Sequence, residues 1–168
     1  MKKIWLLGSA LALAIGLSAC SDKTEDKASE KKTEEASSEK VDVSGTLLDF
    51  YLNLKATVNA KDGDLNAYEG SETKPAADVR QKASESAAAV AAELKIIKAP
   101  AELKDQKEDL EGALKDFTAS YEAKAEELKK DAPSLDAANE TFTQGEDKLK
   151  KAFESAKLVA PTFGAELQ

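Results

Sequence analysis

The chain has 168 residues, a formal net charge of −8, one cysteine and no histidine. Without histidine, the commonest general base and metal ligand is missing, and a lone cysteine permits neither an intrachain disulfide nor a thiolate zinc site. The acidic balance, with Arg80 as the only arginine, argues against nucleic acid as a partner, because phosphate binding depends on clustered Lys and Arg.

Residues 1–19 have the pattern of a secretory signal peptide. Lys2 and Lys3 form a basic start, an apolar run follows over 4–17, and the small residues Ser18 and Ala19 precede Cys20. The run is shorter than the roughly 20 residues that a membrane-spanning helix needs. We therefore expect a signal peptide over 1–19 and not a transmembrane anchor.

The residues Leu17-Ser18-Ala19-Cys20 resemble the lipobox of bacterial lipoproteins. The resemblance implies that the Cys20 thiol receives a diacylglycerol and that the chain is cleaved between Ala19 and Cys20. Two acyl chains on one residue would give stable membrane binding, since one chain alone is marginal at about 0.8 kcal/mol per buried methylene. The alternative is an ordinary secretory signal with a stray cysteine.

The residues after Cys20 bear on the location of the protein. The inner-membrane retention signal of such lipoproteins is an aspartate directly after the cysteine, whereas here Ser21 follows and Asp22 comes one place later. The resemblance therefore implies the outer membrane in a bacterium with two membranes, and the outer face of the cell membrane in a bacterium with one.

Residues 20–40 are predicted to form a disordered, charged tether. Between Ser21 and Lys40 no apolar side chain is larger than alanine, so burial cannot offset the entropy of ordering. A helix is the alternative, because Glu and Lys recur at i,i+4 spacing, but without an apolar stripe it would be marginal.

Residues 41–168, here called the body, show helical periodicity throughout. We expect helices at about 44–60, 79–97, 103–128 and 135–156, with an irregular stretch over 60–75 and Pro161 ending the last helix. The short connections predict an all-α, up-down antiparallel bundle of about four helices behind the tether. Its core would be filled by four aromatic residues, namely Phe50, Phe117, Phe142 and Phe153.

The stretch Asp62-Gly63-Asp64-Leu65-Asn66 opens like a calcium-binding loop. Counted from Asp62, however, the sixth residue is Ala67 where the loop requires glycine, and the twelfth is Thr73 where it requires a bidentate glutamate. We therefore expect a solvated acidic turn here, with no metal and no cofactor.

Catalytic candidates are weak. The carboxylate pairs Glu108 with Glu111 and Glu126 with Glu127 are predicted on a solvated helix face, whereas general acid–base catalysis needs a desolvated group. Ser84 or Ser86 beside Lys82 lacks a third, orienting group. We predict that the protein is not an enzyme. Gly112 and Gly145 interrupt helix patterns, which we interpret as close helix approach.

Two aromatic residues are candidates for binding. Tyr51 and Tyr121 lie on apolar helix stripes and are expected in the core, whereas Tyr68 lies in the irregular stretch, where an aromatic side chain is better placed to meet a partner. Phe163 follows the last helix and either folds back over one end of the bundle or anchors a partner.

These observations predict a lipid-anchored cell-envelope protein whose body is a non-enzymatic interaction or binding module. The expected partners are the membrane, through lipidated Cys20, and an envelope or extracellular protein. A carrier for a small apolar ligand, with a cavity between helices, is the alternative. An envelope enzyme that uses a carboxylate pair is the least favoured.

Overall fold

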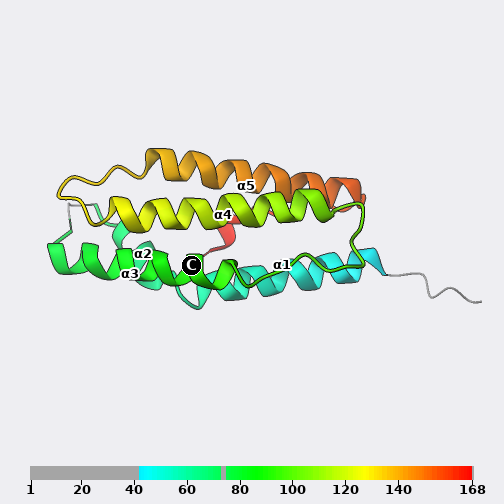
Figure 1. The fold of residues 1–168 in the computed structure, drawn as a ribbon, viewed down its shortest axis with the longest axis horizontal. Coiled ribbons are helices and arrows are strands. Elements are labelled where there is room, and N and C mark those ends of the chain that lie inside the picture. Colours follow the sequence, from blue (N-terminus) through cyan, green and yellow to red (C-terminus); the bar gives the residue numbers. More distant parts are fainter. Residues whose placement is uncertain (1–41, 73–74, 168) are drawn as a thin grey trace, which may run out of the picture. The chain divides into compact units, whose positions relative to one another are not determined.

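The computed structural model describes residues 42–72 and 75–167. The predictions for the signal peptide over 1–19, for Cys20 and for the tether over 20–40 lie outside the described residues. Thr73 also lies outside them. The described part is all-helical, with five α-helices, one short 3₁₀ helix and no strand (Figure 1).

The helices follow one another along the chain, and the connection between α3 and α4, residues 95–106, is longer than the one between α4 and α5, residues 128–135. The bounds are Val43–Asn59 for α1, Gly63–Glu69 for α2, Ala77–Leu94 for α3, Lys107–Glu127 for α4, Asp136–Ser155 for α5 and Gly164–Glu166 for the 3₁₀ helix. The four long helices match the four predicted ranges. Helix α4 starts later than expected, because Leu103 lies in a turn. The Leu103 N–H donates to Pro100 O in that turn.

Helix α1 shows how the sequence specifies a long helix. Asp42 caps its start, with Oδ1 accepting a hydrogen bond from the Gly45 N–H at 3.0 Å. Its buried residues recur every three to four positions and so share one face. They are Leu47, Phe50, Tyr51, Leu54 and Val58.

The prediction of an irregular stretch over 60–75 was wrong, because residues 63–69 form α2. The helix buries only Leu65 among its own residues, so it has no apolar periodicity to reveal it. Contacts with α3 hold it in place. The Ser86 hydroxyl donates to Lys61 O at 2.6 Å and accepts from the Leu65 N–H at 3.3 Å. The described part of the body therefore has five α-helices, four long and one short.

The prediction that Pro161 ends the last helix was also wrong. Helix α5 ends at Ser155 in a Schellman motif, in which the Leu158 N–H bonds to Phe153 O and the Lys157 N–H bonds to Glu154 O. Lys157 takes the left-handed conformation that the motif needs, with φ of 61°. The end of the helix is thus set by backbone hydrogen bonding several residues before the proline.

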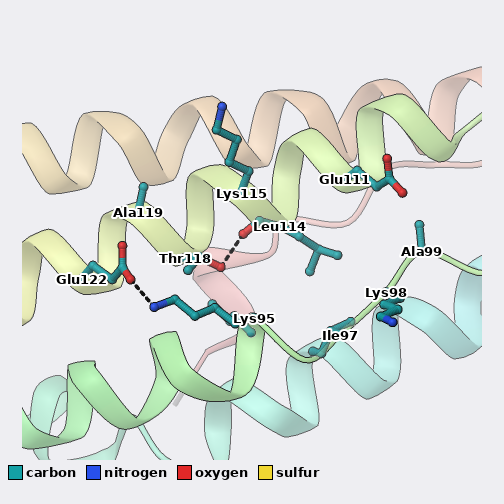
Figure 2. A pocket seen from close by; sticks show the side chains of 11 residues that line it. Lys95, Ile97, Lys98, Ala99, Glu111, Leu114, Lys115, Thr118, Ala119 and Glu122 are labelled. Carbon is teal, nitrogen blue, oxygen red and sulfur yellow. Dashed lines mark hydrogen bonds and ion pairs between the residues drawn. The ribbon is translucent and has the colours of Figure 1, made fainter.

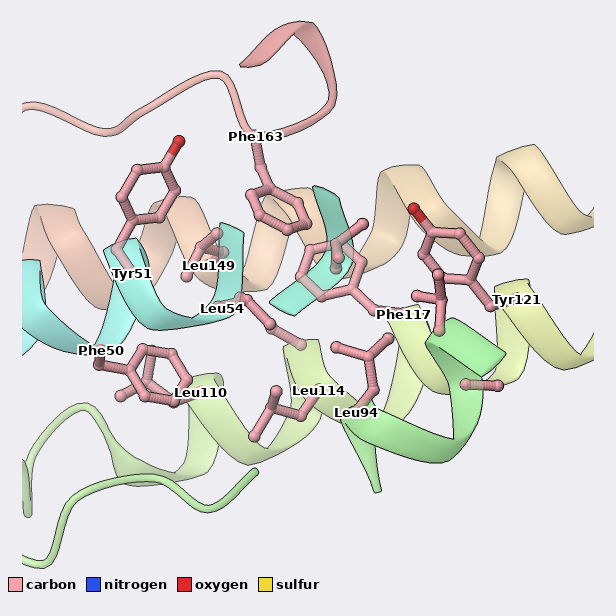
Figure 3. Close-up of a cluster of buried hydrophobic side chains, with 14 of the residues drawn as sticks. Phe50, Tyr51, Leu54, Leu94, Leu110, Leu114, Phe117, Tyr121, Leu149 and Phe163 are labelled. Carbon is pink, nitrogen blue, oxygen red and sulfur yellow. The ribbon is translucent and has the colours of Figure 1, made fainter. Parts of the chain in front are cut away.

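The core lies along α4, which packs against α3 on one side and α5 on the other, while α1 and α2 pack against α3. Phe117 of α4 is fully buried at its centre (Figure 3). Gly145 of α5 lets the two helices approach, since a Cβ there would lie 2.7 Å from the Phe117 ring. Of the four aromatic residues expected in the core, Phe142 is only half-buried.

Candidate functional site

A groove with a volume of about 500 Å³ runs between α4 and residues 94–99, which include the last residue of α3 and the segment after it (Figure 2). Its floor is apolar. Leu94 and Leu114 are buried beneath it and Ile97 is half-buried along it, with Ala99 and Ala119 completing the lining.

Local backbone chemistry explains why residues 95–99 leave this space. The N–H groups of Ile96 and Ile97 bond back to the last turn of α3, so the helix closes there. Ala99 precedes Pro100, and a residue before proline is held away from the helical conformation. The chain therefore leaves the helix after Leu94 and runs on alongside α4 (Figure 2).

Charged side chains surround the groove. Lys95 Nζ lies 2.5 Å from Glu122 Oε1, which links the end of α3 to α4 (Figure 2). Glu111 pairs with Lys107 at 3.6 Å. Each of the two acidic lining residues thus already has a lysine partner. Within the described part of the chain, Lys98 and Lys115 form no ion pair, so the groove joins an apolar floor to unpaired positive charge.

A second feature is a buried charged cluster where α2 meets α4. Lys124 is only 6% exposed, and its Nζ lies 2.7 Å from Glu69 Oε1 and 5.6 Å from the centre of the Tyr121 ring. The buried ammonium is stabilised by the Glu69 carboxylate, whose side chain is partly exposed, and by the aromatic face. The adjacent cleft has a volume of about 360 Å³.

Asp62 belongs to this cluster, and the prediction of a solvated acidic turn was therefore wrong. Its side chain is fully buried, and neither carboxyl oxygen has a hydrogen-bond partner among the described residues. Burial raises the pKa of Asp62, and the nearby Asn66 amide offsets part of that rise. The Tyr121 hydroxyl shares this environment, and its pKa is also raised, chiefly by burial and further by the Asp62 and Glu69 carboxylates.

The structure places the two aromatic binding candidates differently from expectation. Tyr68 lies in α2 and not in a loop, and its half-buried side chain packs against the core. Phe163 is 1% exposed, so it is not a free anchor for a partner. Its ring lies 4.8 Å from that of Phe117, midway along α4, and so does not cover an end of the molecule.

The catalytic candidates are not brought into a common site. Glu108, Glu111 and Glu126 are exposed, and Lys130 lowers the pKa of Glu127, which is opposite to the change that a general acid needs. The hydroxyls of Ser84 and Ser86 are buried, and each donates to a backbone carbonyl.

Sequence reasoning missed the Lys124 cluster and the groove. A signal for the first was present, because Lys124 lies between Tyr121 and Leu128 on the apolar stripe of α4. The groove had no such signal, since it depends on the path of residues 95–99.

Comparison with known proteins identifies no relative. No protein-family model matches the chain, and neither a curated protein nor a solved structure resembles it significantly. No helix in the described residues is long and apolar enough to span a bilayer. The described residues also contain no group of three or more His, Cys, Asp or Glu side chains placed to hold a metal ion.

Proposed function

We propose that this chain is a lipid-anchored protein of the bacterial cell envelope and that its body is a non-enzymatic binding module. The anchor is supported by the lipobox-like residues Leu17-Ser18-Ala19-Cys20 behind a basic start and an apolar run. A diacylglyceryl group on Cys20 would hold the protein at the membrane, and the charged residues 21–40 would give the body reach from it.

We further propose that the four long helices, α1, α3, α4 and α5, form an up-and-down antiparallel bundle that presents the groove. The connection between α4 and α5, residues 128–135, supports this arrangement, because short links favour antiparallel neighbours. A rigid helical body suits a binding role, since it holds the groove in a fixed shape before a partner arrives.

The groove between α4 and residues 94–99 carries the proposal for the body. Its buried leucines, Leu94 and Leu114, offer an apolar floor, while Lys98 and Lys115 remain without acidic partners in the described structure. An envelope or extracellular protein that presents an apolar segment flanked by carboxylates matches this combination. The apolar contact would supply affinity, and the charges would supply orientation.

A photocrosslinking amino acid at Ala119 tests this role in intact cells. Ala119 is exposed and lines the groove, whereas Ala137 is an exposed alanine of α5 outside it and serves as the matched control. We expect one reproducible adduct from position 119, which disappears when Lys98 and Lys115 are both changed to Glu. Identical adducts from positions 119 and 137, or none from 119, would contradict a binding role for the groove.

The size of the groove also supports a second candidate, a carrier of small apolar ligands. A volume of about 500 Å³ lies in the range of small-molecule sites, about 300–1,000 Å³. In that case protein extracted from membranes would contain a bound apolar molecule detectable by native mass spectrometry, and adding that molecule back would raise the melting temperature by linkage. If the protein is such a carrier, the molecule crosslinked at position 119 would be a lipid and not a protein.

A further inference from the structure

Residues 158–167, here called the strap, turn back after α5 and lie against the helices (Figure 1). Figure 3 shows Phe163 pointing from the strap toward Phe117 and Leu54 in the core. The strap therefore follows the last α-helix in the sequence and reaches the core that the helices share.

The binding place of Phe163, here called the seat, is built from three rings on three helices. The Phe163 ring lies 4.8 Å from that of Phe117 in α4 and 6.0 Å from those of Tyr51 in α1 and Phe142 in α5. At these separations aromatic rings attract one another beyond simple burial. Without an aromatic occupant, the three rings would face a hole between α1 and α5.

Polar contacts fix the strap on both sides of this ring. The Gly164 N–H donates to Glu146 Oε1 at 2.8 Å, and Glu166 Oε2 lies 2.9 Å from Lys55 Nζ. A Cβ on Gly164 would come within 3.1 Å of the Phe142 ring. The seat thus selects an aromatic residue, then glycine, then a carboxylate three positions after the aromatic.

The link between α5 and the strap is strained and exposed. Lys157 is held in the left-handed conformation, with φ of 61°, which is unfavourable for a residue with a side chain. Val159 is 93% exposed. From residue 159 onward, the backbone hydrogen bonds of the strap in the described structure stay within it, apart from that of Gly164 to Glu146. The helices recognise the strap almost wholly through side chains.

We propose that the strap exchanges between two copies of this chain, with Phe163 of each copy occupying the seat of the other. An identical strap satisfies the same seat, so reciprocal exchange preserves the ring contacts and both polar contacts. When the link opens, the backbone groups that are paired at the end of α5 become hydrated. Lys157 then leaves its strained left-handed conformation. The resulting dimer is closed and two-fold symmetric, as exchanged dimers generally are. The bridge between the end of α5 and Phe163 is residues 156–162, and seven extended residues span about 23 Å, so the exchanged dimer must bring each seat within that distance of the partner's α5 end.

Crosslinking between Lys55 and Glu166 positions distinguishes the two states. All variants carry Cys20→Ser, which removes the native thiol, and the full chains are purified in mild detergent. The double variant Lys55→Cys/Glu166→Cys, treated with a short bismaleimide, shows that the linker spans this pair within one chain. Next, Lys55→Cys chains and mass-tagged Glu166→Cys chains are mixed, warmed below the melting temperature and treated in the same way.

We expect the mixture to give a mixed dimer that contains one chain of each kind. The control is the pair Lys95→Cys and Glu122→Cys, whose ion pair at 2.5 Å joins the end of α3 to α4, is more exposed than the Lys55–Glu166 pair and does not involve the strap. A mixed dimer from the strap pair but not from the control pair supports exchange. Equal yields from the two pairs, or no mixed dimer from the strap pair, overturn it.

The substitution Lys157→Gly tests the strained link separately. Glycine adopts the left-handed conformation without cost, so it stabilises the closed arrangement, and the yield of mixed dimer should fall by at least about fivefold. An unchanged yield would overturn the strained link as the basis of exchange. Because these experiments use chains without a lipidated cysteine, failure here leaves the proposed membrane anchoring untouched.

Discussion

At the scale of single residues, Asp62 makes the clearest prediction about pH. A buried carboxyl with a raised pKa binds its proton more tightly in the folded chain than in the unfolded one. The free energy of unfolding therefore falls as the pH rises from the ordinary aspartate value of 3.8 through the raised folded value, and the contribution of Asp62 to stability is greatest below both.

We predict that Asp62→Asn is more stable than the wild type at pH 7 and loses this part of the pH dependence. The amide keeps the shape of the side chain but cannot ionise. Urea denaturation at a series of pH values measures the effect. Asp64→Asn, the same change at an exposed position two residues along, should follow the wild-type profile. If the free energy of unfolding of Asp62→Asn changes with pH in parallel with that of the wild type, the ionisation of the buried carboxyl is not linked to folding.

At two helix glycines, substitution by alanine is expected to change the free energy of unfolding in opposite directions. A Cβ at Gly145 would lie 2.7 Å from two carbons of the fully buried Phe117 ring, whereas one at Gly112 would meet only the flexible Lys148 side chain at 3.0 Å. Overpacking a core costs about 1–3 kcal/mol, and replacing a helix glycine with alanine gains about 1 kcal/mol.

We therefore predict that Gly145→Ala lowers the free energy of unfolding by about 1 kcal/mol net, while Gly112→Ala raises it or leaves it unchanged. Chemical denaturation of both variants, followed by circular dichroism, provides the comparison. Stabilisation by Gly145→Ala would mean that Phe117 can move aside, and that the approach of α5 to α4 does not depend on the glycine.

Much of the residue-level chemistry could not be predicted from the sequence. Asp62 looked like part of a solvated turn because its neighbours are polar, yet it is buried since α2 folds over α3 and α4. Lys124 was detectable in principle, because a lysine on an apolar stripe must find a partner. That the partner is Glu69 depends on a helix that the sequence pattern does not reveal.

At the scale of elements, apolar periodicity was sufficient to predict the four long helices. Each buries a face through residues three to four apart, and this signal persists over 17 residues or more. Helix α2 has seven residues and buries only Leu65 among them, so tertiary contacts and not local pattern determine it. The path of the strap was equally hidden, because one phenylalanine in a polar tail does not specify where it binds.

The end of α5 gives a prediction at this scale. We expect Lys157→Gly to raise the free energy of unfolding of the monomer by about 1 kcal/mol, because glycine removes the left-handed strain from the Schellman motif. Thermal and urea unfolding at low protein concentration measure it. Lys150→Gly, an exposed position within α5, is the contrasting change and should destabilise by about 1 kcal/mol. Destabilisation by Lys157→Gly would contradict the claim that the left-handed conformation of Lys157 is strained.

At the scale of the whole molecule, the proposed anchor and the charged residues 21–40 precede a helical body that carries an apolar groove between α4 and residues 94–99. In this proposal the body contributes shape and binding surface. Its candidate catalytic carboxylates are exposed, except the half-buried Glu127, which pairs with Lys130, and the hydroxyls of Ser84 and Ser86 bond to backbone carbonyls. The proposed function therefore depends on where the protein is held as much as on what the groove binds. Location, orientation and local concentration would all follow from the proposed lipid on Cys20.

The most direct test is the intact mass of the protein extracted in detergent from the membranes of its own cells. The account predicts a chain that begins at Cys20 and carries a diacylglyceryl group, and predicts that Cys20→Ala abolishes both the added mass and the membrane association. A membrane-associated chain that retains residues 1–19 without lipid, or a secreted chain with an unmodified Cys20, would contradict the central claim.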